Sequence, residues 1–246
     1  MAIQWTTIGD CKLACADYMD VIPLIPAASI HCVIVDPPYG VRRPSARRRK
    51  EDRFDEIHGN DVVDVRWAGV GYLTEGGACY CFCTWDTLNE FRTGLKASGL
   101  HVRSCVVWDK GVHGLGDTAT CWAPRHEMIL FAAKGRHELR SPRPADVIQF
   151  QRVMPPALKH PYQKPVEMIS RLIQASTDEG DTVADWYMGS GTCGVACVRT
   201  GRKFIGCEIS QEHFDITCQS IETEYKRLSL FITPPKPKTQ RQLPFS

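Results

Sequence analysis

The sequence predicts an α/β fold in which helices cover both faces of a mostly parallel sheet. Short apolar runs of strand length recur along the 246 residues, and turn residues bound each of them. Stretches with a helical spacing of apolar residues lie between several of these runs. The run "VIV" at 33–35 is continuously apolar, which is typical of a strand buried on both faces. Strands that alternate with helices form parallel sheets of this kind.

The expected elements follow one another along the chain. Strands are expected at 3–10, 31–36, 77–85, 104–110, 127–134, 181–187 and 203–209. Helices are expected at 87–98, 165–177 and 211–228, and another begins near Cys193. Because no helix separates 104–110 from 127–134, these strands are expected to form an antiparallel pair at one sheet edge. We expect one domain over 1–230 and a Pro-rich tail at 231–246 that is poorly ordered or a docking strap.

Composition excludes several classes of protein. Apolar residues make up 43% of the chain, charged residues 24%, and the net charge is +2, as in an ordinary globular protein. No signal segment opens the chain and no apolar run approaches a membrane span, so we expect no membrane partner and a cytoplasmic location. The spacing of the 12 cysteines matches no structural zinc site, so we expect reduced, mostly buried thiols and no metal.

Acidic residues mark the ends of several expected strands. Asp10, Asp36 and Asp185 each stand at or near such an end. Ligands of open parallel sheets bind outside the carboxyl ends of the strands. If these strands belong to one sheet, the three carboxylates face one crevice.

The turn after the strand at 31–36 is built to present its side chains. Pro37 and Pro38 cannot continue a hydrogen-bonded ladder, and they hold the chain stiff and extended. Asp36 and Tyr39 are then exposed to a ligand instead of being packed in the core. A surface turn that only caps a core strand explains a lone Pro-Pro pair equally well.

A glycine-rich turn lies between an expected strand and an expected helix. It contains Gly189, Ser190, Gly191 and Thr192, and free amides at the helix start favour an anionic group. No lysine follows the last glycine, which argues against a phosphate-binding P-loop. Glu208 ends the next strand, where an acid accepts hydrogen bonds from ribose hydroxyls, although such an acid is often a helix cap. Together these features predict a nucleoside cofactor.

Four segments resemble motifs of the amino-group DNA methyltransferases. "DPPYG" at 36–40 is similar to the catalytic motif, "HPYQKP" at 160–165 to the tenth motif and "DWYMGSGT" at 185–192 to the first motif. "RHEMILFAAKG" at 125–135 is similar to the segment that precedes the target-recognition region. The order is that of the permuted beta class, and the resemblance spans about residues 3 to 225.

The resemblance implies a fold and a donor. The fold is the Rossmann-like methyltransferase fold, with a seven-stranded, mostly parallel sheet that has one antiparallel strand and a circularly permuted motif order. The donor is S-adenosylmethionine. It is expected to contact the glycine turn with its methionine part, Glu208 with its ribose and Asp10 with the Cys11 backbone at its adenine edge. Lys164 is expected to pair with its carboxylate, or else to cap the following helix. The implied cofactor-binding residues are Asp10, Cys11, Lys164, Asp185, Tyr187, Gly189, Ser190, Gly191, Thr192 and Glu208.

The sequence departs from the family next to the glycine turn. The family has Pro and Phe after the acid of this motif, where the chain has Trp186 and Tyr187. Both replacements are large and able to stack, so the departure affects the shape of the pocket.

The resemblance also implies a reaction. Asp36 and the Pro37 carbonyl would accept hydrogen bonds from an exocyclic amine, and Tyr39 would stack on the base after it leaves the helix. The expected catalytic residues are Asp36, Pro37, Pro38 and Tyr39. Direct transfer needs no covalent intermediate. Asp at the first motif position favours N6 of adenine in DNA as the target. The alternatives are N4 of cytosine in DNA and amino groups of RNA or protein.

Basic and aromatic residues are the expected contacts to double-stranded DNA. A basic run lies in the loop 42–60, and the target-recognition segment at about 136–159 is short. Such a run is also common in solvated loops, and an aromatic residue in a loop is as often a packed anchor. The expected DNA-binding residues are Arg42, Arg43, Arg47, Arg48, Arg49, Lys50, Trp122, Arg140 and Arg143. Without a nuclease motif, the chain resembles a stand-alone or phage-type enzyme of restriction-modification. The resemblance implies a bacterial or phage-infected host cytoplasm as its location, and the sequence leaves a homodimer open. An idle DNA-binding module is disfavoured because both the catalytic turn and the glycine turn are intact.

Overall fold

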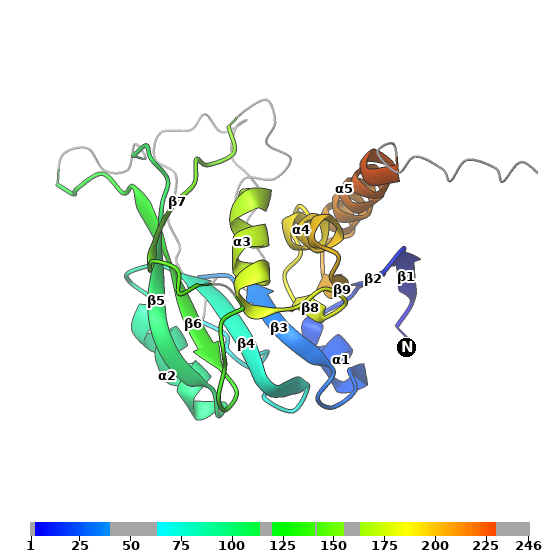
Figure 1. Ribbon diagram of the computed structural model, residues 1–246, viewed down its shortest axis with the longest axis horizontal. Coiled ribbons are helices and arrows are strands. Elements are labelled where there is room, and N and C mark those ends of the chain that lie inside the picture. The colour runs from blue at the N-terminus through cyan, green and yellow to red at the C-terminus, as the bar shows by residue number, and fades with distance from the viewer. Residues whose placement is uncertain (1–2, 40–62, 114–119, 141, 155–162, 230–246) are drawn as a thin grey trace, which may run out of the picture.

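The computed structural model describes residues 3–39, 63–113, 120–140, 142–154 and 163–229. These residues form a nine-stranded sheet with helices on both faces (Figure 1). The strands are β1 (Trp5–Ile8), β2 (Cys11–Cys15), β3 (Ile30–Val35), β4 (Leu73–Cys83), β5 (His101–Asp109), β6 (His126–Ala133), β7 (Val147–Gln149), β8 (Thr182–Asp185) and β9 (Lys203–Glu208). The helices are α1 (Tyr18–Val21), the 3₁₀ helix η1 (Ile22–Leu24), α2 (Leu88–Ala97), α3 (Val166–Ser176), α4 (Thr192–Thr200) and α5 (Gln211–Ser229).

The order of the strands confirms the predicted fold class. It is β1-β2-β9-β8-β3-β4-β6-β5-β7. The central seven strands, from β2 to β5, are parallel except for β6, which runs antiparallel to β4 and β5. Two short strands extend this core: β1 pairs antiparallel with β2, and β7 pairs parallel with β5. We call the edge at which β2, β9, β8, β3, β4 and β5 end the carboxyl edge.

Two apolar cores lie on opposite faces of the sheet. Successive residues of β3 alternate between them: Cys32 and Ile34 pack in one core with α3, α4 and α5, and Val33 and Val35 pack in the other with α1 and α2. Figure 1 shows these two groups of helices on the two sides of the sheet. By the same alternation, Asp36 follows on the side of Ile34 and therefore on the side of α3.

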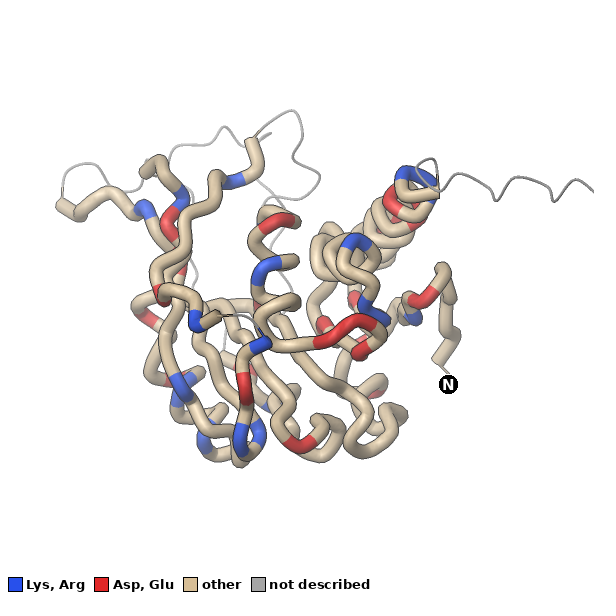
Figure 2. The backbone as a smooth tube through the Cα atoms, viewed as in Figure 1, with Lys and Arg blue, Asp and Glu red and all other residues tan. Residues whose placement is uncertain are grey.

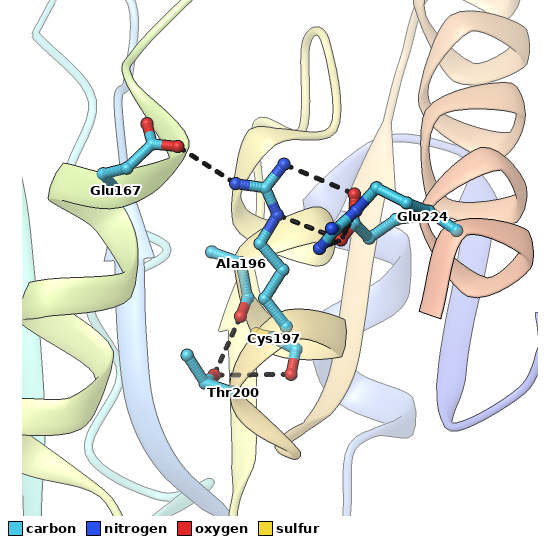
Figure 3. A network of polar contacts seen from close by, with 7 residues as sticks. Glu167, Ala196, Cys197, Thr200 and Glu224 are labelled. Carbon is cyan, nitrogen blue, oxygen red and sulfur yellow. Dashed lines mark hydrogen bonds and ion pairs between the residues drawn. The ribbon is translucent and has the colours of Figure 1, made fainter. Parts of the chain in front are cut away.

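An ion-pair network fixes the three helices of the first group to one another (Figure 3). Glu224 of α5 is only 5% exposed, and its Oε1 lies 3.0 Å from Nε of Arg199 in α4 and 2.6 Å from Nη2 of Arg227. Nη1 of Arg199 lies 3.0 Å from Oε1 of Glu167 in α3. A buried carboxylate needs such partners, because an unpaired one is strongly destabilising. The network thereby joins the start of α3 to the last turn of α4 and to α5.

The first expected strand is wrong in one respect that matters for function. The segment 3–10 is not a single strand that ends on Asp10, because β1 stops at Ile8 and the chain turns back into β2. Gly9 makes this turn with φ +55°, and a Cβ there would lie 2.3 Å from the Tyr225 ring. Asp10 therefore precedes β2 and lies at the edge opposite the carboxyl edge.

Several expectations concern residues outside the described ranges. These residues are the basic loop 42–60 and the tail 231–246. None of the helices in the described part of the chain has the length and apolarity needed to cross a membrane. The cysteines are all free thiols, most of them buried, as expected.

Candidate active site

Asp36 follows β3 at the carboxyl edge, and both of its oxygens have partners. The Tyr39 hydroxyl donates to Oδ1, and Nζ of Lys164, just before α3, lies 2.6 Å from Oδ2. Pro37 is buried, Pro38, Asp36 and Tyr39 are half-buried, and Tyr39 packs against the core, so the turn is packed more closely than the sequence predicts. Burial raises the pKa of Asp36 and neighbouring Glu127 adds to this, while Lys164 opposes both. The four expected catalytic residues thus form one rigid turn beside a cation.

Lys164 lies between two carboxylates. It is 8% exposed, and its Nζ is 3.0 Å from Oε2 of Glu127 as well as 2.6 Å from Asp36. The Phe82 ring lies beneath it, with its centroid 4.9 Å from Nζ. The alternative that Lys164 caps the helix is not what the structure has, because the N-cap of α3 is Pro165 without a side-chain cap. The contact with a cofactor carboxylate stays a prediction.

The glycine turn is held by side chains of β9 and α5. Gly191 adopts φ +79°, and a Cβ there would lie 3.0 Å from Cα of Thr217 in α5, so glycine suits this position. The Gly189 amide donates to Oε2 of Glu208 at 2.8 Å, and Thr217 donates to the Gly189 carbonyl at 2.9 Å. Ser190 and Thr192 are buried within the turn.

The glycine turn is joined to the catalytic turn through Lys164. Oγ1 of Thr192 donates to the Lys164 carbonyl at 3.4 Å, while the Lys164 side chain reaches Asp36. Two motifs that are far apart in the sequence therefore form one site. This is the juxtaposition that the crevice at the strand ends predicts.

The residues of the glycine turn fit a nucleoside cofactor. Glu208 is buried, accepts from the amides of Gly189 and Ser210, and keeps further lone pairs for hydroxyl donors. The start of α4 supplies backbone amides next to it. Tyr187 lies close to Tyr18 of α1, with ring centroids 5.4 Å apart, and offers an aromatic wall. An acid for hydroxyls, amides for an anion and aromatic rings are the groups that such a cofactor needs.

Asp185 is a buried carboxyl group between the two halves of the site. Its Oδ1 accepts from the Tyr187 amide at 2.9 Å. Burial, with smaller contributions from the charges of Asp36 and Glu208, raises the pKa of Asp185 to about 8. The protonated form is therefore favoured in the folded, cofactor-free protein at neutral pH.

Two of the expected cofactor residues are misplaced by the sequence reasoning. Asp10 and Cys11 lie at the edge opposite Glu208, where the Asp10 amide donates to the Tyr225 hydroxyl at 2.8 Å. The residue at the carboxyl end of β2 is Asp17. The Ala16 amide beside it donates to the Glu208 carbonyl at 3.0 Å, and Asp17 accepts from the Met19 amide. Its signal is an acid two residues after the run "CKLAC" at 11–15.

The expected DNA contacts are divided between the two edges. Trp122, between β5 and β6, is 99% exposed near the carboxyl edge, so it is not a packed anchor. The expectation for Arg140 is corrected by its position. Nε of Arg140 lies 3.1 Å from Asp178, which precedes β8 at the opposite edge of the sheet, so Arg140 is remote from Asp36. Arg143 is exposed ahead of β7. The run from Arg42 to Lys50 lies outside the described residues.

Three further residues at the carboxyl edge escape the sequence reasoning. Trp85 follows β4, next to the catalytic strand, and is 81% exposed. Arg125 precedes β6 and pairs with Asp109 at 2.6 Å. Glu127 contacts Lys164, as described above. Figure 2 shows basic and acidic residues interspersed along the described backbone, and no group of three or more His, Cys, Asp or Glu within it could hold a metal ion.

Comparisons with known proteins identify the relatives of this chain. A family model described as DNA methylase matches residues 30–219. The Type II methyltransferase M.HpaI of Haemophilus parainfluenzae is 25% identical over 244 residues, which cover 88% of this chain and 76% of that protein. The Type II methyltransferase M2.DpnII of Streptococcus pneumoniae is 25% identical over 224 residues, covering 80% of this chain and 84% of the relative.

Solved structures support the fold. The crystal structure of the M1.HpyAVI-SAM complex has a TM-score of 0.65 and 21% identity, over 85% of this chain and 98% of that chain. The PvuII DNA methyltransferase, which is cytosine-N4-specific, has a TM-score of 0.69 and 16% identity, over 90% and 93% of the two chains.

We expect Asp185→Asn to make stability less dependent on pH. The pKa of Asp185 is raised, so its contribution to stability is full below the pKa of an ordinary aspartate and is lost as the pH rises through about 8. Relative to the wild type, the free energy of unfolding of the Asn variant should therefore increase between about pH 5 and about pH 8, by an amount on the order of a few kcal/mol. Urea unfolding of the cofactor-free protein over this range measures it. A difference that does not change with pH would contradict the assignment, and exposed Asp20→Asn is the control.

Proposed function

The chain belongs to the DNA methylase family, whose model matches residues 30–219, and we propose that it transfers a methyl group from S-adenosylmethionine to N6 of adenine in double-stranded DNA. At the coarser level the chain is a DNA methyltransferase that acts on exocyclic amines, as its family and its Type II relatives indicate. The choice of adenine and the roles of single residues are the parts that we propose.

The observation that carries the proposal is the pair of acceptors at the end of β3. An exocyclic amine is a poor nucleophile because its lone pair is delocalised into the ring. The Asp36 carboxylate and the Pro37 carbonyl accept its two N–H groups and raise the electron density on nitrogen. Because both acceptors stand on a turn that two prolines stiffen, they are oriented before the base arrives.

The target base has to leave the DNA stack to reach this turn. Extrusion costs a few kcal/mol, which stacking in the pocket offsets. Tyr39, half-buried beside Asp36, supplies the stacking ring, and its hydroxyl also holds the Asp36 side chain. The turn therefore both binds the base and orients its amine.

The cofactor residues are those of the glycine turn and its neighbours. Glu208 accepts from ribose hydroxyls, the backbone of 189–192 approaches the methionine part, and Lys164 is within the same site to pair with a carboxylate. When bound, S-adenosylmethionine supplies an electrophilic methyl group on a sulfonium. Asp17 replaces Asp10 as the acid that we assign to the nucleoside end, because it stands beside Glu208 at the carboxyl edge.

Direct transfer fits the state of the nearby thiols. Cys81 and Cys83 of β4 lie near enough to Asp36 for its charge to raise the pKa of their thiols. Burial raises the pKa of Cys81 well above its ordinary value and that of Cys83 to about 12, so both are protonated at neutral pH. A protonated thiol is a weak nucleophile, and a covalent intermediate on cysteine is disfavoured.

The DNA-facing surface is proposed to be the carboxyl edge around Asp36. Two exposed tryptophans, Trp85 and Trp122, stand there beside Arg125, and Arg152 follows β7 on the same side. Aromatic rings stack on bases and guanidinium groups bind phosphates. The basic run from Arg42 to Lys50 directly follows the catalytic turn in sequence and favours a nucleic acid over a protein substrate.

The first prediction of this proposal concerns the product. Unmethylated duplex DNA incubated with the protein and S-adenosylmethionine, then digested to nucleosides, should contain N6-methyladenine by mass spectrometry. Asp36→Ala should reduce the product by a factor of about 100 or more, because it removes one of the two acceptors of the amine. The exposed Asp20→Ala should leave the yield unchanged.

N4-methylcytosine instead of N6-methyladenine would overturn the choice of base while keeping the reaction. Absence of both from DNA, with methyl transfer to RNA or protein, would overturn DNA as the substrate.

The second prediction concerns the DNA-facing surface. Trp85→Ala and Trp122→Ala should each weaken binding of a labelled DNA duplex by about fivefold or more, since a stacked base is stabilised by roughly 1–3 kcal/mol. Fluorescence anisotropy at fixed salt measures this. Leu24→Ala, which removes an exposed apolar side chain of η1, is the matched control. Unchanged affinity in both tryptophan variants would place the DNA on another surface.

A further inference from the structure

A row of alternating charges runs along the carboxyl edge from the catalytic strand to β5. Its members are Asp36 after β3, Lys164 before α3, Glu127 in β6 and Lys110 after β5. Nζ of Lys164 lies 2.6 Å from Asp36 and 3.0 Å from Glu127, and Nζ of Lys110 lies 2.7 Å from Glu127. Each charge is thus flanked by the opposite sign, and the row as a whole is neutral.

Aromatic rings of the sheet support both lysines of this row. The Phe82 ring of β4 lies under Lys164, and the Trp108 ring of β5 lies 5.3 Å from Nζ of Lys110. Trp108 is itself fixed, because its indole nitrogen donates to the Phe150 carbonyl at 2.7 Å. Rings beneath the ammonium groups limit the directions in which they can move.

Glu127 forms a buried ion pair with Lys164. Its buried Oε2 lies 3.0 Å from Nζ of Lys164. Although burial raises it, the two lysines lower the pKa of Glu127 to about 2, so Glu127 is ionised at neutral pH. Lys164 is therefore shared between two carboxylates, and the closer one is Asp36.

Sharing affects what Asp36 can do in the proposed reaction. A lysine with a single carboxylate partner binds it more tightly and draws more electron density from it. The carboxylate is then a weaker acceptor for the amine of the target base. A second carboxylate on the far side of the lysine reduces this withdrawal, and it also adds negative charge near Asp36.

We propose that Glu127, held by Lys110, is a positioning residue that keeps Lys164 from binding Asp36 exclusively and so preserves Asp36 as an acceptor for the target amine. This inference rests on the proposed role of Asp36. Glu127 contacts neither the base nor the donor, and it acts through Lys164.

The other titratable groups that face Asp36 come from the elements packed around it. Tyr39 donates to it from its own turn, and Cys81 and Cys83 face it from β4. Asp185 faces it from β8. Cys81, Cys83 and Tyr39 are protonated at neutral pH because burial raises their pKa, and Asp185 is largely protonated for the same reason. Lys164 and Glu127 are therefore the charged groups that most affect the Asp36 carboxylate.

The test compares Glu127→Gln with Glu127→Asp. Gln has the shape of Glu but no charge, and Asp keeps the charge on a shorter side chain. We expect Glu127→Gln to lower kcat by about tenfold or more, with the KM for DNA within about threefold, because a weaker acceptor affects the methyl-transfer step. Glu127→Asp should recover a large part of kcat. Glu90→Gln, an exposed acid of α2, is the matched control.

A second readout does not depend on turnover or on the identity of the substrate. The side-chain carboxyl of Asp36, assigned in ¹³C NMR spectra by its loss in Asp36→Asn, should titrate at lower pH in cofactor-free Glu127→Gln than in the wild type. Removing a neighbouring negative charge favours the ionised carboxylate, so the sign of the shift is downward. If the wild type methylates no DNA, the proposed function fails, whereas this titration still tests Glu127.

Two results would overturn the inference. One is an unchanged titration of Asp36 together with an unchanged kcat in Glu127→Gln. The other is an equal loss of kcat in the Gln and Asp variants that parallels an equal loss of melting temperature, which is the pattern of a merely structural residue.

Discussion

The buried ion pair between Lys164 and Asp36 is the contact on which the rest of the site depends. Through its side chain, Lys164 holds the catalytic turn, and through its backbone carbonyl it accepts from Thr192 of the glycine turn. A lysine that is 8% exposed needs a carboxylate partner to stay charged. The fold meets this requirement because β3 and α3 end and begin at the same edge of the sheet. Lys164 therefore holds the catalytic turn and the glycine turn next to each other before any ligand binds.

The sheet explains why residues so distant in sequence meet in this way. β3 pairs with β8 although most of the chain lies between them, and both run in the same direction. Their carboxyl ends therefore bring Asp36 and Asp185 together, with the glycine turn directly beyond Asp185. The network of Arg199 and Glu224 joins α4 and α5 to α3. At the other end of α4, the hydrogen bond from Thr192 joins the glycine turn to Lys164. α3, α4 and α5 thus both pack against the sheet and carry or adjoin residues of the site.

The sequence predicted the parts of the site that depend on local chemistry. The continuous run at 33–35 and the two prolines identify the end of β3, and the glycines at 189 and 191 identify the turn before α4. Asp10 was misassigned because the tight turn at Gly9 divides an apparently single strand, which moves the acid to the opposite edge. Glu127 and Lys110 carry no local signal, since their role arises from pairing between β5 and β6 and from contact with Lys164. Arg140 likewise finds its partner, Asp178, only in the folded chain.

The central claim is that one edge of the sheet carries a donor half, centred on Glu208, and a target half, centred on Asp36. Calorimetric titration of S-adenosylmethionine into the wild type, Glu208→Gln and Asp36→Ala tests it most directly. The account predicts that Glu208→Gln weakens cofactor binding by about tenfold or more, since hydrogen bonds to a charged group contribute roughly 1.5–3 kcal/mol. Asp36→Ala should bind the cofactor within about threefold of the wild type, because Glu127 still pairs with Lys164 and the Lys164 carbonyl still accepts from Thr192. The reverse pattern, with binding lost in Asp36→Ala and kept in Glu208→Gln, would contradict the division of the site.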